Sequence, residues 1–501
     1  MWTKEEREKE KERREFESLS LRNVEKERTR LDLLKEEHDE MKNVTADQEV
    51  GLFHQLLSPG IKMISIKGAP GTGKTSLALR LLEFAGSGTY ISTRVGMMKL
   101  SYQNSRLPVS ENVDRLQKVM LDASKTDYKD LRLATPSIAL AEILKAVKSK
   151  KRLTILDSWD AIAKEMDAKD RLKIEKTIAA IIDTSKSSAV FISEEPELST
   201  VDYMVDAVLA LGYVEIEGRQ IREITIEKLR GHSINERKKA YTLKDGLFSF
   251  LTKPVFETKT PRKFKPVSGS DTHFSTGSED LDSFLGGGLS KGLLMLLEDG
   301  KRVGTLWHLP LIEMMCANFL MNGGSCLAIL PPQVSPRMIL DDAIQYVGDD
   351  IVNSSLRIIS YIPTFQHSSI IDVSGKSSEE VYNIRARAVR DMKLRSVKKH
   401  TLWILSMDTY ESFSSNVGPS VARDIARSAS AIRNQGDVVV SLTKPGTSNT
   451  QLLSDNCDVH LKLEEVNGSL ILYGKRPPTN PYGVTYDYSA GYPKVFLTEI
   501  I

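Results

Sequence analysis

The stretch GAPGTGKT at residues 68–75 constrains the fold more than any other feature of this chain. It satisfies the pattern G-x-x-x-x-G-K-[ST], with the apolar run MISIK directly before it and the helical pattern SLALRLLEF directly after it. Such a loop works where a strand delivers the chain to the N-terminus of a helix, because backbone NH groups and the helix dipole together attract an anion. The motif therefore predicts a strand, loop and helix of an α/β fold.

The same loop predicts a binding site for nucleotide phosphates. Its glycines let the backbone wrap an anion without Cβ clashes. Lys74 would reach the β and γ phosphates, and Thr75 would offer its hydroxyl to Mg²⁺, so ATP and Mg²⁺ are the expected cofactors. The predicted nucleotide-binding residues are Gly68, Ala69, Pro70, Gly71, Thr72, Gly73, Lys74, Thr75 and Ser76.

The metal side of such a site needs an acid at the end of another buried strand. The run LTILDSWD supplies Asp157 directly after four residues with the pattern of a strand. Thr75 and Asp157 are therefore the predicted metal ligands. Asp160 lies three residues further on, and the sequence leaves open whether it caps the following helix or acts in the site.

The 501 residues suggest two or three domains. Short apolar runs alternate with amphipathic stretches from about residue 50, which predicts a parallel sheet with helices on both faces. The pattern stops at a proline-rich basic stretch and then begins again. The predicted parts are a charged helical arm (1–45), an ATPase domain with the intact loop (46–252), a basic linker (253–272) and a second domain without that loop (273–501).

The second half is predicted to be a diverged copy of the first, because three segments recur in the same order. Residues 141–160 parallel 388–408, residues 205–211 parallel 457–463, and residues 223–231 parallel 469–477. The shared order and spacing favour duplication over the chance likeness of two α/β domains.

The N-terminal arm and the composition define the setting. Residues 1–43 contain 12 basic and 14 acidic residues and no proline or glycine, which favours a solvated helix and leaves a short coiled coil or a disordered arm open. The chain shows no apolar signal segment, no run of 18 apolar residues and only three scattered cysteines. These features predict a cytoplasmic protein with no membrane span. The formal net charge of +2 identifies no partner.

The motifs GAPGTGKT, YIST, ILDSWD and ITIEKLRGH resemble those of KaiC-type domains in the RecA-like ATPase superfamily. Residues 274–292, FSTGSEDLDSFLGGGLSKG, resemble the motif with which that family's domains open. The resemblance covers about residues 50–501. It implies two tandem RecA-like (KaiC-type) domains with mostly parallel sheets flanked by helices. It also implies a homo-oligomeric ring, with a hexamer as one candidate, and nucleotide at the subunit interfaces. The P-loop, the YISTRV segment and the basic regions also resemble archaeal GvpD-like regulators of gas vesicle synthesis.

The second copy departs from this family pattern. Where a second P-loop is expected, the chain reads EDGKRVGTL. Aligning Gly304 with the last glycine of the first loop puts Thr305 at the lysine position and Leu306 at the threonine position. Ser406 stands where the first copy has its strand-end acid. We therefore expect a pseudo-domain with a structural or partner-binding role.

The first site also lacks a standard feature of a hydrolase. RecA-like ATPases usually carry a glutamate just after the second strand to orient the attacking water, whereas this chain has Thr93, Arg94 and Val95 there. The missing base predicts slow turnover. Glu194 and Glu195, after a later strand, are candidate substitutes, with ordinary surface acids as the alternative.

Lys228 and Arg230 match the K-x-R-G motif of the resembled family. The resemblance implies that they place positive charge on the γ-phosphate of a neighbouring subunit. Their spacing alone fits two basic residues on a polar strand face equally well. The predicted catalytic residues are Lys74, Asp157, Glu194, Glu195, Lys228 and Arg230.

Three basic stretches, at 219–239, in the linker and at 385–400, fit a solvated face, an acidic regulatory protein partner or nucleic acid. Aromatic residues among them are few, and no helix-turn-helix or zinc-finger pattern is present. The sequence favours an ATP-binding, slowly hydrolysing protein that acts as a nucleotide-dependent regulatory switch or assembly scaffold. A DNA-acting recombinase or repair-type ATPase, and a structural oligomer with nucleotide at subunit interfaces, remain the alternatives.

Overall fold

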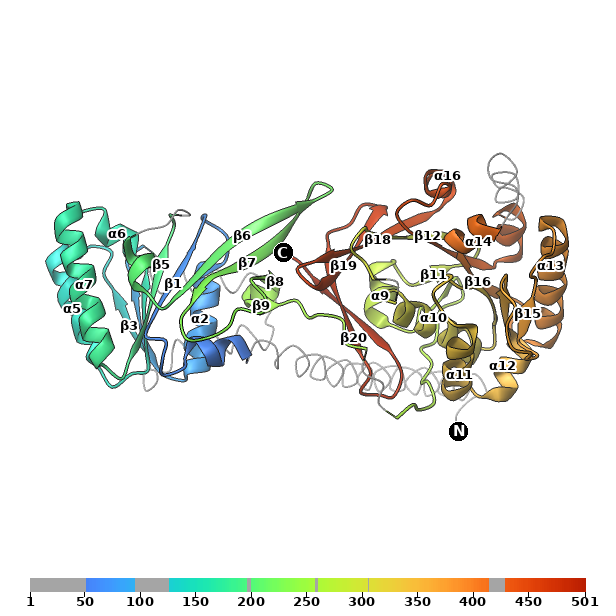
Figure 1. The fold of residues 1–501 in the computed structure, drawn as a ribbon, viewed down its shortest axis with the longest axis horizontal. Coiled ribbons are helices and arrows are strands. Elements are labelled where there is room, and N and C mark those ends of the chain that lie inside the picture. Colours follow the sequence, from blue (N-terminus) through green and yellow to red (C-terminus); the bar gives the residue numbers. More distant parts are fainter. Residues whose placement is uncertain (1–50, 95–125, 196–199, 257–259, 305, 414–428) are drawn as a thin grey trace, which may run out of the picture. The chain divides into compact units, whose positions relative to one another are not determined.

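The computed structural model describes residues 51–94, 126–195, 200–256, 260–304, 306–413 and 429–501 (Figure 1). Residues 51–501 form one compact unit with two large mixed sheets, each flanked by helices. This arrangement confirms the predicted α/β fold with tandem RecA-like halves. The predicted charged arm at 1–45 lies outside the described residues. No helix of the described residues has the length and apolar character needed to cross a membrane.

The first sheet has nine strands in the order β3-β2-β4-β5-β1-β6-β7-β8-β9. Neighbours from β3 to β6 in this order pair in parallel, and neighbours from β6 to β9 pair antiparallel. The strands are β1 (Met63–Gly68), β2 (Gly88–Ser92), β3 (Thr126–Asp130), β4 (Leu153–Asp157), β5 (Ser188–Ser193), β6 (Ala207–Ile216), β7 (Arg219–Leu229), β8 (Lys238–Thr242) and β9 (Ser249–Phe250).

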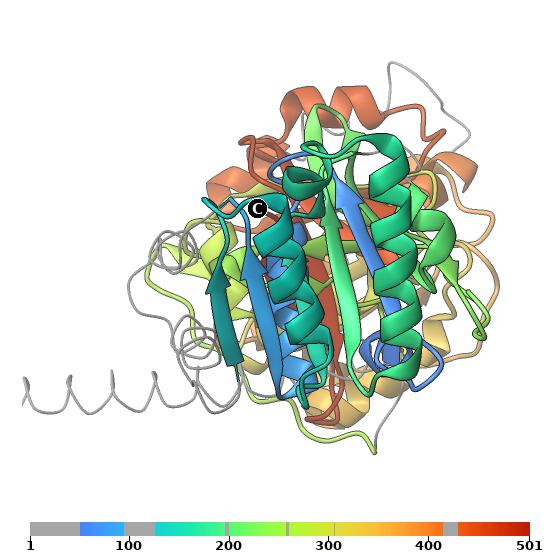
Figure 2. The same cartoon turned by 90° about the vertical axis from the view of Figure 1, so that its left-hand side faces the viewer.

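Helices cover both faces of this sheet, and we call the described residues 51–250 the N-terminal lobe. The helices include α2 (Lys74–Ala85), α5 (Pro136–Val147), α6 (Trp159–Ala163), α7 (Ala168–Thr184) and α8 (Thr200–Met204), with a 3-10 turn at Lys244–Gly246. The apolar face of α2 lies in one buried cluster, and α5 and α7 contribute to a second. Figure 2 shows α5 and α7 in front of the strands. Since both faces are covered, the central parallel strands are almost wholly buried.

The second sheet has ten strands in the order β15-β14-β13-β16-β17-β12-β18-β19-β20-β21. Its strands are β12 (Leu294–Asp299), β13 (Ser325–Ile329), β14 (Leu356–Ser360), β15 (Ile370–Asp372), β16 (Thr401–Ser406), β17 (Val438–Thr443), β18 (Val459–Val466), β19 (Ser469–Arg476), β20 (Tyr482–Asp487) and β21 (Lys494–Glu499). A separate small sheet pairs β10 (His273–Phe274) with β11 (Leu289–Ser290).

The two large sheets repeat the same topology. Each strand of the first sheet has a counterpart at the same place in the second sheet, for example β12 for β1, β13 for β2 and β16 for β4. The second sheet adds β15 as an extra edge strand. The three recurring sequence segments fall on α5-β4 and α13-β16, on β6 and β18, and on β7 and β19. The predicted internal repeat is therefore visible strand by strand.

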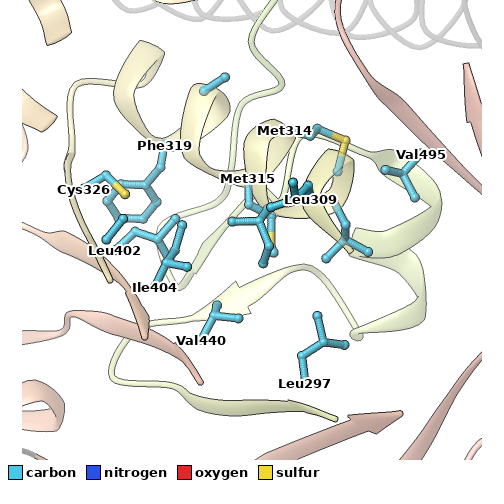
Figure 3. Close-up of a cluster of buried hydrophobic side chains, with 14 of the residues drawn as sticks. Leu297, Leu309, Met314, Met315, Phe319, Cys326, Leu402, Ile404, Val440 and Val495 are labelled. Carbon is cyan, nitrogen blue, oxygen red and sulfur yellow. The ribbon is translucent and has the colours of Figure 1, made fainter. Parts of the chain in front are cut away.

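The described residues 260–501 form what we call the C-terminal lobe. Its helices include α9 (Glu279–Phe284), α10 (Leu309–Met321), α11 (Pro336–Val347), α12 (Asp349–Ser355), α13 (Ser378–Arg395), α14 (Met407–Phe413) and α16 (Thr450–Asn456). Helix α10 contributes Met314, Met315 and Phe319 to the largest buried cluster, against Ile404 and Val440 of the sheet (Figure 3).

The two lobes share a small buried apolar cluster. Its members are Ile221, Ala240 and Leu251 of the first lobe and its following segment, and Val466, Ile471, Tyr473 and Ile500 of the second. The predicted linker at 253–272 has no regular helix or strand in its described part. It is nevertheless anchored, because Phe264 is buried in the C-terminal core and its NH donates to the Tyr346 carbonyl at 2.9 Å.

Candidate nucleotide site

The predicted P-loop joins the end of β1 to the start of α2. Gly68, Gly71 and Gly73 all have positive φ, at 147°, 82° and 92°. A Cβ at Gly68 would lie 2.3 Å from the Leu211 carbonyl oxygen, so this position admits no side chain. The loop thus takes a shape that its glycines permit, and it presents the N-terminus of a twelve-residue helix.

Lys74 is the first residue of α2 and its side chain lies within the loop. Its Nζ donates to the carbonyl oxygens of Gly68 at 2.7 Å and Ala69 at 2.9 Å. Burial lowers the pKa of Lys74, while the carboxylates of Glu194 and Asp157 act in the opposite direction. The ammonium group is therefore held inside the loop that would receive the phosphates.

Thr75 and Asp157 come together as predicted. The Thr75 hydroxyl donates to Asp157 Oδ2 at 2.7 Å, which joins the start of α2 to the end of β4. Tyr90, on β2, donates its hydroxyl to the same oxygen at 2.5 Å. Burial, followed by the neighbouring Asp157 charge, raises the pKa of Tyr90 well above its usual value, so the hydroxyl stays protonated and donates. Tyr90 is not among the predicted site residues, although its place on the adjacent parallel strand β2 was a usable signal.

Asp160 reaches across to the end of β5. It is 2% exposed and accepts hydrogen bonds from the Ser193 hydroxyl at 3.0 Å and from the Glu194 backbone NH at 2.6 Å. The N-cap of α6 is Ser158, so Asp160 is not the helix cap. Its carboxylate instead fixes the backbone that carries Glu194.

The two candidate glutamates differ in their surroundings. Glu194 forms an ion pair with Arg94, and it is the carboxylate with the largest effect on the pKa of Lys74. Glu195 lies 3.9 Å from Lys164, its side chain is 43% exposed, and it does not contribute to the Lys74 shift. The structure therefore brings Glu194 to the site and leaves Glu195 at the surface. Val95 lies outside the described residues.

Lys228 and Arg230 lie at the other end of the sheet from their own P-loop. Leu229 pairs with Ala207, which pairs with Ile64 near the start of β1, whereas the loop begins at Gly68. Four residues of strand correspond to about 13 Å. The Lys228 Nζ donates to the Asp202 and Tyr203 carbonyls, both at 3.1 Å, and Arg230 pairs with Asp206 at 3.1 Å. Burial and the nearby Arg230 charge lower the pKa of Lys228.

The family model of the KaiC ATPase matches residues 53–254. This part of the chain is a KaiC-type ATPase domain. The chain is also similar to Protein GvpD2 of Halobacterium salinarum, with 27% identity over 479 residues that cover 88% of this chain and 94% of that protein. It is similar to Protein GvpD1 of the same organism, with 24% identity over 529 aligned residues that cover 87% of this chain and 93% of that protein.

Both similarities extend well past the KaiC-type domain into the C-terminal lobe. Strand register identifies the residues of this lobe that correspond to the start of the P-loop. Lys67 and Glu298 each pair with the last residue of the next parallel strand, so Glu298 corresponds to Lys67 and Asp299 to Gly68. A carboxylate thus replaces the first glycine of the P-loop, which the sequence analysis did not anticipate.

Both carboxylates have close partners within the lobe. Asp299 lies 2.9 Å from Nδ1 of His308, and both are buried. Glu298 lies 2.8 Å from Nε2 of His460 and 3.5 Å from the Lys462 ammonium. Burial would raise the pKa of Glu298, but the His460 hydrogen bond and the lysine charges outweigh it and hold the pKa at about 2. A charged carboxylate here opposes phosphate binding.

The predicted alignment of the second loop needs one correction. Residues 69–73 separate β1 from α2, whereas residues 300–308 separate β12 from α10. The longer loop makes Leu309, and not Thr305, the counterpart of Lys74 as the first helical residue. Thr305 itself lies outside the described residues. The conclusion is unchanged, because Leu309 cannot contact phosphate as a cation.

The strand-end acid is absent from the C-terminal lobe in the way the sequence predicts. Ser406 ends β16 and pairs with Leu442, as Asp157 ends β4 and pairs with Ile192. Asp408 has moved onto α14, where it pairs with Lys444 at 3.7 Å. Among the described residues, no group of three or more His, Cys, Asp or Glu side chains could hold a metal ion.

Proposed function

We propose that this protein binds ATP at residues 68–76, hydrolyses it slowly and acts as a nucleotide-dependent regulatory switch or assembly scaffold. The observation that carries the proposal is the joining of Lys74, Thr75 and Asp157 around one glycine loop. The match of this region to the KaiC ATPase family supports the same conclusion.

The donor set fits Mg²⁺, because a hydroxyl and a carboxylate 2.7 Å apart are oxygen ligands of the kind this ion prefers. When bound, Mg²⁺ would neutralise charge on the β and γ phosphates. Thr75 and Asp157 would hold it. Lys74 would exchange its two carbonyl partners for phosphate oxygens, and the loop NH groups would bind the rest of the anion.

Slow turnover follows from the residues around the expected γ-phosphate. Thr93 and Arg94 occupy the positions where related ATPases usually carry the water-orienting glutamate. Glu194 is our candidate for this role, but its carboxylate is already engaged in an ion pair with Arg94. Loss of a general base typically lowers a rate by about 10² to 10⁴.

Assembly into a homo-oligomeric ring would give Lys228 and Arg230 a catalytic role. Strand register places both residues far from their own P-loop, which supports a role for their charge at the site of a neighbouring subunit. The resemblance to GvpD-like regulators favours a regulatory protein partner and a cytoplasmic location. A DNA-acting ATPase is the competing proposal, since several basic stretches are present.

The test compares ATP hydrolysis and light scattering of the wild-type protein with those of Lys74→Ala, with and without DNA. Lys169→Ala, at an exposed position of α7, is the matched control. Slow hydrolysis that does not respond to DNA, with assembly that needs both ATP and Lys74, would support the switch. Turnover raised several-fold by DNA would favour the nucleic-acid ATPase instead. Assembly on ATP with no turnover would favour the structural oligomer.

A further inference from the structure

The outermost part of the P-loop is held by the β6-β7 hairpin. Tyr213 donates its hydroxyl to the Gly71 carbonyl oxygen at 3.1 Å. Arg222 donates to the same oxygen at 2.9 Å and to the Tyr213 hydroxyl at 2.9 Å, with its guanidinium 5.2 Å from the centre of the Tyr213 ring. None of these groups belongs to the P-loop motif, yet together they fix one of its carbonyls.

A second contact reaches the next residues of the loop from β8 and its end. The buried Tyr241 hydroxyl donates to the Thr72 carbonyl oxygen. Burial raises the pKa of Tyr241, so the hydroxyl remains a donor. The Leu243 side chain packs over Gly73, where an added Cβ would lie 2.8 Å from Leu243 Cδ1. The loop therefore rests against the antiparallel part of the sheet along three successive residues.

The same elements also contact the C-terminal lobe. The Arg222 Nε donates to the main-chain oxygen of Ile501. Thr242 donates its hydroxyl to the Glu499 carbonyl oxygen at 2.8 Å. Since successive side chains of a strand point to opposite faces, Tyr241 faces the P-loop while Thr242 faces β21. Arg222 alone among these residues bonds to both the loop and the C-terminal lobe.

Packing makes this connection stiff. Ile221, next to Arg222, and Ala240, next to Tyr241, lie in the buried cluster that the two lobes share, together with Ile500. Close-packed interiors pass on a displacement because few voids can absorb it. A shift of the P-loop backbone would therefore act on Arg222, which bonds to Ile501 just after β21 and is next to Ile221 of the shared cluster.

We propose that Arg222 is a positioning residue that ties the P-loop to the C-terminal lobe, so that β21 responds to nucleotide at residues 68–76. This inference rests on the proposed function, since it requires that the P-loop binds ATP. The degenerate lobe would then respond to whether nucleotide is bound at the intact P-loop.

Arg219 provides a matched control on the same strand. Its guanidinium donates to the Thr479 carbonyl at 3.1 Å and the Gly474 carbonyl at 2.8 Å, and it lies 4.3 Å from the Tyr473 ring centre. Arg219 thus joins the lobes without touching the P-loop. Its loss loosens the interface, whereas the loss of Arg222 also removes one of the two hydrogen bonds that the Gly71 carbonyl accepts from the hairpin.

The experiment measures hydrogen exchange of a peptide covering 494–501 in the full chain, with and without a non-hydrolysable ATP analogue and Mg²⁺. Wild-type, Arg222→Met and Arg219→Met proteins are compared, and circular dichroism melts check their folding. Binding of a fluorescent ATP analogue is measured separately for each protein.

Loss of one exposed charge-assisted hydrogen bond weakens nucleotide affinity about fivefold. Because the coupling between two sites acts equally in both directions, nucleotide binding should slow hydrogen exchange of the 494–501 peptide in the wild-type protein by up to about fivefold. Arg222→Met should bind nucleotide about fivefold more weakly and, when saturated, show no slowing. Arg219→Met should still show it. Nucleotide binding with unchanged wild-type exchange, or full slowing in Arg222→Met, would overturn the coupling alone. A wild-type protein that does not bind the analogue would overturn the proposed function as well.

Discussion

Glu298 occupies the position in the C-terminal lobe that Lys67 occupies in the KaiC-type domain. Replacing it with glutamine tests whether its negative charge stabilises this lobe. The substitution Glu298→Gln keeps a hydrogen-bond acceptor for His460 and removes the negative charge that faces Lys462. We expect the C-terminal lobe to lose stability at neutral pH, because Lys462 keeps its charge and loses one of its carboxylate partners.

The size of the loss follows from the pKa of Glu298, which is lowered from 4.5 to about 2. This difference corresponds to about 3 kcal/mol of stabilisation at neutral pH, and the 18% exposure of the side chain reduces our expectation to about 2 kcal/mol. A carboxyl with a lowered folded pKa stabilises the protein above its unfolded pKa, and the effect is lost as pH falls through the folded value. The difference between wild type and variant should therefore shrink by about two fifths between pH 7 and pH 3.5.

Urea unfolding followed by hydrogen exchange in peptides from β12 and β18 would measure this lobe separately from the other. Glu379→Gln, at an exposed position of α13, is the control and should change stability by less than about 0.5 kcal/mol. A loss in Glu298→Gln that is no larger than in the control, or one that does not change with pH, would refute the argument.

Three further predictions concern the intact site. Gly68→Ala should abolish ATP binding and lower the melting temperature, because its Cβ would meet the Leu211 carbonyl. The control Gly86→Ala has φ 75° and nothing within 4 Å of an added Cβ, so it should cost about 1 kcal/mol of stability and leave ATP binding intact. Calorimetry and a binding titration check both variants. Asp160→Asn should lower the ATP hydrolysis rate at least tenfold and change the ATP affinity less than threefold. The reason is that the substitution alters the backbone at Glu194 and leaves the P-loop unchanged. An equal loss of hydrolysis rate and ATP affinity would contradict this prediction. Mixing Lys74→Ala subunits with Arg230→Ala subunits should restore part of the hydrolysis that each lacks alone, and failure to do so would count against action between subunits.

Local motifs made the centre of the site predictable. The P-loop glycines and Lys74 lie within eight consecutive residues, and Asp157 follows an apolar run that had to be a strand. The parallel sheet then brings the two segments together, with Thr75 and Asp157 2.7 Å apart. The repeated segments likewise predicted the second lobe, because the same apolar and basic patterns fold into the same strand order.

Residues that depend on distant contacts were beyond the sequence. Nothing near Arg222 in the chain indicates that it bonds to Gly71, 151 positions away. The Arg94 ion pair with Glu194 likewise arises only when β2 and β5 end at the same edge of the sheet. The loop at 300–308 was misaligned for a related reason, since glycine spacing cannot reveal where a lengthened loop gives way to helix.

We expect this chain to bind nucleotide at the intact P-loop and not at the corresponding position of the C-terminal lobe. Isothermal titration of the purified protein with a non-hydrolysable ATP analogue and Mg²⁺ tests it most directly, with Lys74→Ala titrated in parallel. We expect one nucleotide bound per chain in the wild-type protein and none in the variant. Two nucleotides per chain, or one that remains bound in Lys74→Ala, would contradict it.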